Sequence, residues 1–145
     1  ERQHYRGVNA LYIIQNWDRI ARGERPILPG DGSEVHDYIH VADLAAAHVI
    51  ALEALVADPK RSHTLNCGYG HGYSVMQVLD AVDRVTNNKL VRKMEGRRAG
   101  DPYSLISDNS AIKAQFGWQP RYDDLDMIVR HALAWERQLS ERQVD

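Results

Sequence analysis

The chain has 145 residues, of which 43% are apolar and 26% charged, and its net charge at pH 7 is −2. These values are typical of a globular domain large enough to bury a core, and the slight negative charge argues against nucleic acid as the main partner. The sequence has no run of about 18 apolar residues of the kind that would predict a membrane span. The single cysteine, Cys67, excludes an internal disulfide and fits a reducing cytoplasm. Because the sequence opens at Glu1 without a methionine, we expect it to be part of a longer protein.

Hydrophobic spacing predicts a first helix over residues 9–22. The apolar side chains that share one face of this helix are Leu11, Ile14, Trp17 and Ile20. Gly23 is expected to end the helix. After Ile27–Pro29, the glycines of Gly30–Ser33 predict a tight turn.

Residues 35–41 alternate between two faces, which predicts a strand with His36 and His40 on the same face. Asp43 is expected to cap the next helix, because aspartate is a favoured N-cap residue. That helix should continue through Leu55 and end before Asp58 and the proline that follows it.

A short strand is predicted at residues 63–66, followed by the glycine-rich sequence GYGHGY at residues 68–73. Its glycines do not have the G-x-G-x-x-G spacing of a dinucleotide-binding turn, so we expect a flexible turn in preference to direct ligand contact. Ser74 should begin a helix that Asn87 ends. The predicted apolar face of this helix consists of Val75, Val78, Leu79, Val82 and Val85.

Residues 89–94 and 105–107 are predicted to be short strands. Asp108 should cap a short helix that ends at Gly117, and Asp123 or Asp124 should cap the last helix. The predicted apolar stripe of that last helix consists of Leu125, Ile128, Ala132, Trp135 and Leu139. No repeat or linker interrupts the pattern, so we expect one mixed α/β unit over residues 1–145.

The sequence does not indicate several common kinds of functional site. His36 and His40 could form a metal pair, but no third ligand lies at a convincing spacing. No serine lies in a G-x-S-x-G motif, so nucleophilic serine chemistry is not indicated. Cys67 has an apolar context that predicts an inert thiol. The three tryptophans are expected to serve in packing, and they are Trp17, Trp118 and Trp135.

The sequence GRRAGDP at residues 96–102 is the best candidate for ligand binding. Its glycines and proline predict a loop, and arginine on a shaped loop suits a phosphate or carboxylate because its planar guanidinium donates two parallel hydrogen bonds. A solvated pair of charges is the alternative interpretation. The residues alone therefore predict a domain with one basic loop for an anionic ligand, without revealing a reaction.

Four stretches resemble the C-terminal part of the UDP-glucose 4-epimerase family, which belongs to the extended short-chain dehydrogenase/reductases. They are GDGSEVHDYIHVADLAAAHVIAL, TLNCGYGHGYSVMQVLDAV, RRAGDPYSLISDNSAIKAQFGWQP and LDMIVRHALAWE. The DYIHVxDLA element is shared by many nucleotide-sugar enzymes, whereas RRxGDP followed by GWxP is more specific to the 4-epimerases. The resemblance implies that residues 1–145 form a C-terminal nucleotide-sugar-binding domain.

The resemblance also implies a set of substrate-binding residues. Arg98 and Asp101 would bind the UDP part of the substrate, and Ile27–Pro29 would run beside the uracil. Asn9 would line another wall of the pocket. Leu105 would lie beside the C2 substituent of the sugar, where its size favours UDP-glucose and UDP-galactose over N-acetylated sugars.

Two positions depart from the family pattern. His36 stands where an arginine commonly contacts the diphosphate, and a neutral histidine lacks the fixed charge and the two-pronged geometry of arginine. Pro29 stands where an aromatic residue is common, which weakens any stacking on uracil. Both departures bear on which nucleotide sugar is preferred.

The family holds NAD on an N-terminal Rossmann domain and uses a Tyr-x-x-x-Lys pair at the sugar C4 atom. This chain contains neither motif. The resemblance therefore implies that catalytic and cofactor-binding residues lie outside the chain, which alone should be inactive. The parent enzyme should be a homodimer that interconverts UDP-glucose and UDP-galactose through a 4-keto intermediate. A nucleotide-sugar decarboxylase or dehydratase and a non-catalytic binding module remain alternatives.

Overall fold

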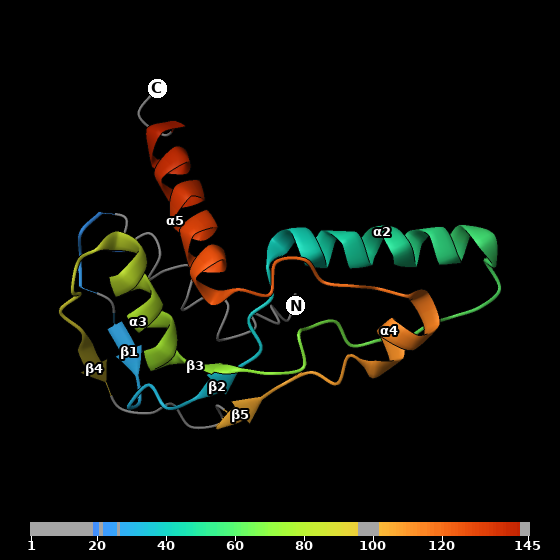
Figure 1. Ribbon diagram of the computed structural model, residues 1–145, viewed down its shortest axis with the longest axis horizontal. Coiled ribbons are helices and arrows are strands. Elements are labelled where there is room, and N and C mark those ends of the chain that lie inside the picture. Colours follow the sequence, from blue (N-terminus) through green and yellow to red (C-terminus); the bar gives the residue numbers. More distant parts are fainter. Residues whose placement is uncertain (1–18, 21, 26, 96–101, 143–145) are drawn as a thin grey trace, which may run out of the picture.

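The computed structural model describes residues 19–20, 22–25, 27–95 and 102–142, and the side chains of these residues except 27–29, 93–95 and 140. Within these ranges the fold is mixed α/β, as predicted (Figure 1). The helices are α2 (Val41–Ala57), α3 (Val75–Thr86), α4 (Ser110–Phe116) and α5 (Leu125–Arg142). The strands are β1 (Ile27–Pro29), β2 (Val35–His36), β3 (Tyr73–Ser74), β4 (Lys93–Glu95) and β5 (Ser104–Leu105).

The strands form two small sheets. β1 and β4 pair in parallel, with Pro29 opposite Glu95. In the second sheet β2 lies between β3 and β5, antiparallel to β3 and parallel to β5. His36 is the register partner of both Tyr73 and Leu105. The two sheets thus hold the two chain segments that flank residues 96–101.

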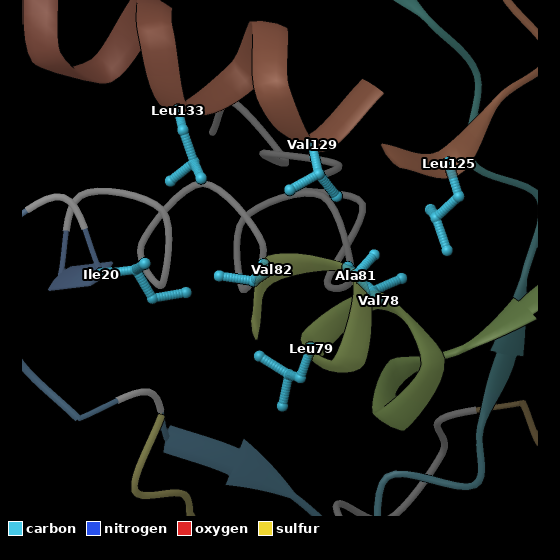
Figure 2. Packing of buried hydrophobic residues seen from close by; sticks show 8 residues of the cluster. All are labelled: Ile20, Val78, Leu79, Ala81, Val82, Leu125, Val129 and Leu133. Atoms are coloured by element: carbon cyan, nitrogen blue, oxygen red, sulfur yellow. The ribbon is translucent and has the colours of Figure 1, made fainter. Parts of the chain in front are cut away.

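The main apolar core lies between α3 and α5 (Figure 2). Its buried residues are Ile20, Val78, Leu79, Ala81, Val82, Leu125, Val129 and Leu133. The prediction for α3 is confirmed, since Val78, Leu79 and Val82 face the core. The predicted stripe of α5 was partly wrong, because the buried row follows an i, i+4, i+8 spacing from Leu125. The side chain of Trp135 is half-exposed, and the guanidinium group of Arg142 lies over its ring.

A second core joins α2 to α4. It consists of Ala47, Tyr69, Ile112 and Trp118, with Ile39, Ile50, Leu65, Cys67, Phe116 and Ile128 packed against it. The indole of Trp118 is buried and donates from Nε1 to the carbonyl oxygen of Asp43 at 3.2 Å. The expectation that Trp118 serves in packing is therefore confirmed, whereas Trp17 lies outside the described residues.

Most helix ends follow the sequence. Ser74 and Gln77 form a reciprocal capping box at the start of α3, and Asn87 ends that helix in the left-handed conformation with φ of 50°. Asp124 accepts from the amide of Met127 at 2.7 Å in the first turn of α5. Gly23 has φ of 75° and its amide donates to Ile20, so the end of the first predicted helix lies there. The rest of that helix lies largely outside the described residues.

Two predicted caps were wrong or displaced. α2 begins at Val41 with His40 as its N-cap, because the His40 ring accepts from the amide of Ala42 at 3.0 Å. Asp43 points into the structure instead, where it is buried. At α4 the N-cap position is Asn109, although the carboxylate of Asp108 accepts from the amide of Ser110 at 3.0 Å.

The predicted strands were too long or misplaced. Residues 37–40 leave β2 and lead into α2, so His36 and His40 do not share a strand. Residues 63–66 form no strand with any described segment. The other two predictions correspond to β4 and β5, each shifted by a few residues. Short strands depend on their neighbours for hydrogen bonds, which alternation of side chains alone does not reveal.

Candidate functional site

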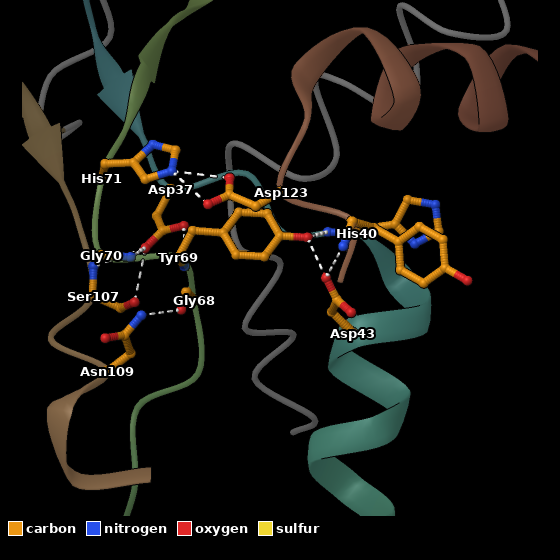
Figure 3. A network of polar contacts seen from close by, with 11 residues as sticks. Asp37, His40, Asp43, Gly68, Tyr69, Gly70, His71, Ser107, Asn109 and Asp123 are labelled. Carbon is orange, nitrogen blue, oxygen red and sulfur yellow. Dashed lines mark hydrogen bonds and ion pairs between the residues drawn. The ribbon is translucent and has the colours of Figure 1, made fainter. Parts of the chain in front are cut away.

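The carboxylate of Asp37 joins three separate segments just beyond β2 (Figure 3). Oδ1 accepts from the amide of Tyr69 at 2.8 Å, and Oδ2 accepts from the amide of Gly70 at 3.0 Å. The amide and hydroxyl of Ser107 donate to Oδ2 at 3.3 and 2.8 Å. Every group that is hydrogen-bonded to this carboxylate is a donor, which suits an ionised carboxylate because its oxygens can only accept hydrogen bonds. Asp37 thus links β2, the glycine-rich segment and the segment after β5.

The glycine-rich segment packs tightly at this junction. A side chain at Gly68 would meet the hydroxyl of Ser107 and the carboxylate of Asp37, and a Cβ at Gly72 would lie 2.6 Å from Val35 Cγ1. The carbonyl oxygen of Gly68 accepts from Asn109 Nδ2 at 2.7 Å. Because Asp37 already occupies two backbone amides of the segment, those amides are not available to a phosphate. The segment therefore serves as a packed turn before α3, which fits the interpretation favoured from the sequence.

A second carboxylate, that of the buried residue Asp43, joins α2 to the segment before α5. It accepts from the Tyr69 hydroxyl at 2.7 Å and from the amides of Arg121 and Tyr122 at 2.9 Å each. Burial alone would raise the pKa of Asp43, but these hydrogen bonds outweigh it and lower the pKa. Burial and the hydrogen bond to Asp43 raise the pKa of Tyr69, so its hydroxyl remains protonated and donates. This network holds the fold together and contains none of the predicted substrate-binding residues.

Three rings cluster at the start of α2. The ring of His40 stacks on that of Tyr122, with centroids 4.6 Å apart, and contacts His131 of α5 edge to face. His40 Nε2 lies 2.8 Å from His131 Nδ1. Burial, reinforced by His131, lowers the pKa of His40 despite the opposing effect of Asp43. Nearby, His71 Nε2 lies 2.9 Å from a carboxylate oxygen of Asp123.

The roles of Asp37 and Asp43 in joining distant segments were not predicted from the sequence. Asp37 fell on the same predicted face as Val35 and Ile39, and an acidic residue on an otherwise apolar face was the available signal. A buried carboxylate requires donors around it, and the amides of a neighbouring glycine-rich turn are natural candidates. Asp43 carried a weaker signal, since aspartate in the first turn of a helix is usually a cap or an exposed charge.

The described members of the predicted substrate-binding set lie on strands that pair with the chain before and after residues 96–101. Ile27 and Pro29 belong to β1, where Pro29 pairs with Glu95, the residue directly before position 96. His36 is buried in β2, beside Leu105 of β5, which follows position 101 in the chain. Leu105 itself is 59% exposed. Arg98, Asp101 and Asn9 lie outside the described residues.

The remaining candidates have clear surroundings. Burial, together with the nearby charges of Asp37 and Asp43, raises the pKa of Cys67 and favours the thiol, a poor nucleophile. Within the described ranges, no group of three or more histidine, cysteine, aspartate or glutamate side chains could hold a metal ion. No helix in the same ranges is both long enough and apolar enough to cross a membrane.

Comparison with known proteins shows which proteins this chain is similar to. Residues 3–68 match the NAD dependent epimerase/dehydratase family. The UDP-glucose 4-epimerase of Azospirillum brasilense is 45% identical over 140 residues, which cover 91% of this chain and 40% of that protein. The UDP-Glc/GlcNAc 4-epimerase from Campylobacter jejuni has a TM-score of 0.75 and 38% identity, covering 94% of this chain and 43% of that one.

A third relative is the UDP-glucose-4-epimerase from Stenotrophomonas maltophila, whose structure contains NAD and formylated UDP-arabinopyranose. It has a TM-score of 0.77 and 34% identity, and the match covers 89% of this chain and 40% of that chain. The chain is thus related to the NAD-dependent epimerases and dehydratases, and it has the fold of part of such a protein. Within that class, its resemblance to the UDP-glucose 4-epimerases is confirmed. The chain spans about two fifths of the length of these relatives.

Proposed function

We propose that this chain is the nucleotide-sugar-binding part of a UDP-glucose 4-epimerase that interconverts UDP-glucose and UDP-galactose. The observation that carries the proposal is the pairing of the two strands that precede and follow residues 96–101 in the chain. β4, which ends at Glu95, pairs with β1 beside Pro29, and β5, which begins at Ser104, pairs with β2, where Leu105 lies beside His36. Residues expected around the nucleotide and the sugar therefore pair with the chain just before and just after the basic segment.

The chemistry of the proposed site follows from its residue types. Arg98 would neutralise the diphosphate and donate to its oxygens, because guanidinium groups match phosphate geometry. Asp101 would accept hydrogen bonds from ribose hydroxyls. His36 can donate from one ring nitrogen even when neutral, so it would bind the diphosphate more weakly than the arginine common at this position.

The epimerase chemistry itself would require residues beyond this chain. Bound NAD would supply reversible hydride transfer at the sugar C4 atom. The described residues show no nucleotide-binding glycine turn, since the amides of Tyr69 and Gly70 are occupied by Asp37. We therefore place the cofactor and the Tyr-x-x-x-Lys pair in the remainder of a longer, homodimeric parent. The chain alone would be inactive.

The surface of α2 supports a longer parent. Val41, Val49, Leu52 and Val56 lie on one helical face and are 73%, 55%, 62% and 75% exposed. Figure 1 shows α2 extending away from α3 and α5, with α4 beside it. Residues 62–67, which follow α2, pair with no described strand. An exposed apolar stripe of this kind marks a contact surface, and we assign it to contact with the cofactor-binding part of the parent.

The test is an assay of the complete protein that contains residues 1–145. Incubation with UDP-galactose should yield UDP-glucose, and the reverse reaction should proceed to the same equilibrium mixture. Formation of a dehydrated UDP-sugar, or loss of CO2 from UDP-glucuronic acid in a parallel incubation, would instead support the alternative enzymes of the class. Binding of UDP-sugar without any conversion would support a non-catalytic module.

A further inference from the structure

The relationship between Asp37 and β5 extends beyond local packing. The amide of Asp37 donates to the carbonyl oxygen of Leu105 at 3.1 Å, while its side chain binds the amide and hydroxyl of Ser107. One residue therefore holds β5 through its backbone amide and the segment directly after β5 through its carboxylate. On the other side of the same carboxylate, Tyr69 and Gly70 fix the glycine-rich segment.

The packing leaves this junction little freedom. Gly68 has no room for a side chain, since a Cβ there would collide with Ser107 and Asp37. Ile106 packs against Gly72, where an added Cβ would lie 3.1 Å from Ile106 Cγ1. The direction of β5 is thus set by the carboxylate and by the turn behind it. Leu105, half of whose surface is open, lies on the strand so fixed.

We propose that Asp37 is a positioning residue for nucleotide-sugar binding, because its carboxylate sets the placement of β5 and of Leu105 beside His36. The inference rests on the proposed function, and it concerns a residue that would not touch the substrate. Asp37 acts through β5, so its loss should weaken ground-state binding of the nucleotide sugar. The cofactor and the reacting C4 atom would lie elsewhere and should be little affected.

Asp37→Asn is the informative variant, because it keeps the shape and removes one acceptor. Each carboxylate oxygen faces backbone amides, so an Asn NH2 group must point at a donor in either orientation. In the complete protein we expect KM for UDP-glucose and the Kd for UDP to rise about tenfold, since small displacements of binding groups are costly. The kcat and the amount of bound NAD should change less than about threefold by the same reasoning.

Asp43→Asn is the matched control, since the Asp43 carboxylate also accepts from two backbone amides and a hydroxyl, but those donors belong to Arg121, Tyr122 and Tyr69 and not to the segment after β5. Both variants should lower the unfolding temperature, and only Asp37→Asn should raise KM and Kd. Equal KM values in the two variants would show that Asp37 is merely structural. If Asp37→Asn does not fold, Ser107→Ala serves instead, because it removes one hydrogen bond and keeps the carboxylate. It should raise KM about twofold to threefold without lowering kcat, and an unchanged KM would overturn the inference.

The wild-type protein separates the two claims. If it neither binds UDP nor converts UDP-galactose, the proposed function fails whatever the variants do. If it does both and Asp37→Asn has wild-type KM and Kd, only the positioning role of Asp37 is refuted.

Discussion

His40 and His131 contact each other through ring nitrogens, with Nε2 of His40 2.8 Å from Nδ1 of His131, although 91 positions separate them in the chain. His40 Nδ1 accepts from the amide of Ala42, so it carries no proton in this arrangement. The proton of the neutral His40 ring is therefore on Nε2, and it is donated to His131 Nδ1. A second proton on His131, at Nδ1, would place two donors face to face. A second proton on His40, at Nδ1, would remove the acceptor that caps α2.

We predict that stability falls as the pH is lowered through the histidine range. Burial and His131 lower the pKa of His40 in the folded chain, whereas an unfolded histidine titrates near its ordinary value of about 6.5. Below that value the unfolded state binds a proton that the folded state resists, so stability is lost as the pH decreases toward the folded pKa. Above the unfolded pKa, His40 is neutral in both the folded and the unfolded state, and its full contribution to stability is present.

The measurement is the midpoint of thermal unfolding between pH 7.5 and about 5, a window set by the ordinary histidine pKa. His40→Asn is the comparison, because asparagine can cap α2 and does not titrate. Its midpoint should depend less on pH than that of the wild type. An identical pH dependence would show that His40 does not control acid stability in this window.

Tyr69→Phe should destabilise the chain without altering its fold. The hydroxyl donates to Asp43 and accepts from the amide of His40, and both partners are buried. Losing a hydrogen bond to a charged group costs roughly 1.5–3 kcal/mol in the free energy of unfolding. Denaturant unfolding measures the loss. In a double-mutant cycle with Asp43→Asn the two changes should be less than additive, and full additivity would contradict a direct coupling.

Arg98→Ala in the complete protein should weaken UDP-sugar binding while leaving bound NAD unchanged. A charge-assisted hydrogen bond to phosphate contributes about 1.5–3 kcal/mol, so the Kd should rise roughly tenfold to a hundredfold. Arg97→Ala is the matched control, since the resemblance assigns the clamp to Arg98 only. Calorimetric titration with UDP compares the two variants. Equal losses would show that the two arginines act as a diffuse basic patch.

Leu105→Ser should relax the choice of sugar. Leu105 is exposed on β5 and lies beside His36, so its side chain is free to contact a ligand there. A size difference in an apolar pocket discriminates by about 1–3 kcal/mol, and the wild type should therefore prefer UDP-glucose moderately over UDP-N-acetylglucosamine. The ratio of kcat/KM for the two substrates should shift toward the N-acetyl sugar in the variant. A wild type that already favours the N-acetyl sugar would refute this role for Leu105.

The helices could be predicted from the sequence better than the strands. The residues of α3 repeat with helical spacing and Ser74 and Asn87 mark its ends, so local information was sufficient. β2 could not be delimited, because its length depends on pairing with β3 and β5, which come from distant parts of the chain. The predicted strand at residues 63–66 has no described neighbour to supply hydrogen bonds.

For the candidate site, residue types indicated a ligand but not its surroundings. The basic loop was recognisable from its arginines and glycines, and the pairing of His36 with Leu105 was not. Asp37 shows why. Its carboxylate accepts from three residues that lie 32, 33 and 70 positions away in the chain, and no local pattern encodes such a convergence.

We assign substrate binding to this chain, and the cofactor and the catalytic pair to the remainder of a longer enzyme. The most direct test of this division measures NAD content and the conversion of UDP-galactose to UDP-glucose for two purified proteins, the complete protein and residues 1–145 alone. We expect bound NAD and conversion for the complete protein, and neither for residues 1–145. NAD bound to residues 1–145 alone, or a complete protein that carries NAD and leaves UDP-galactose unchanged, would contradict this division.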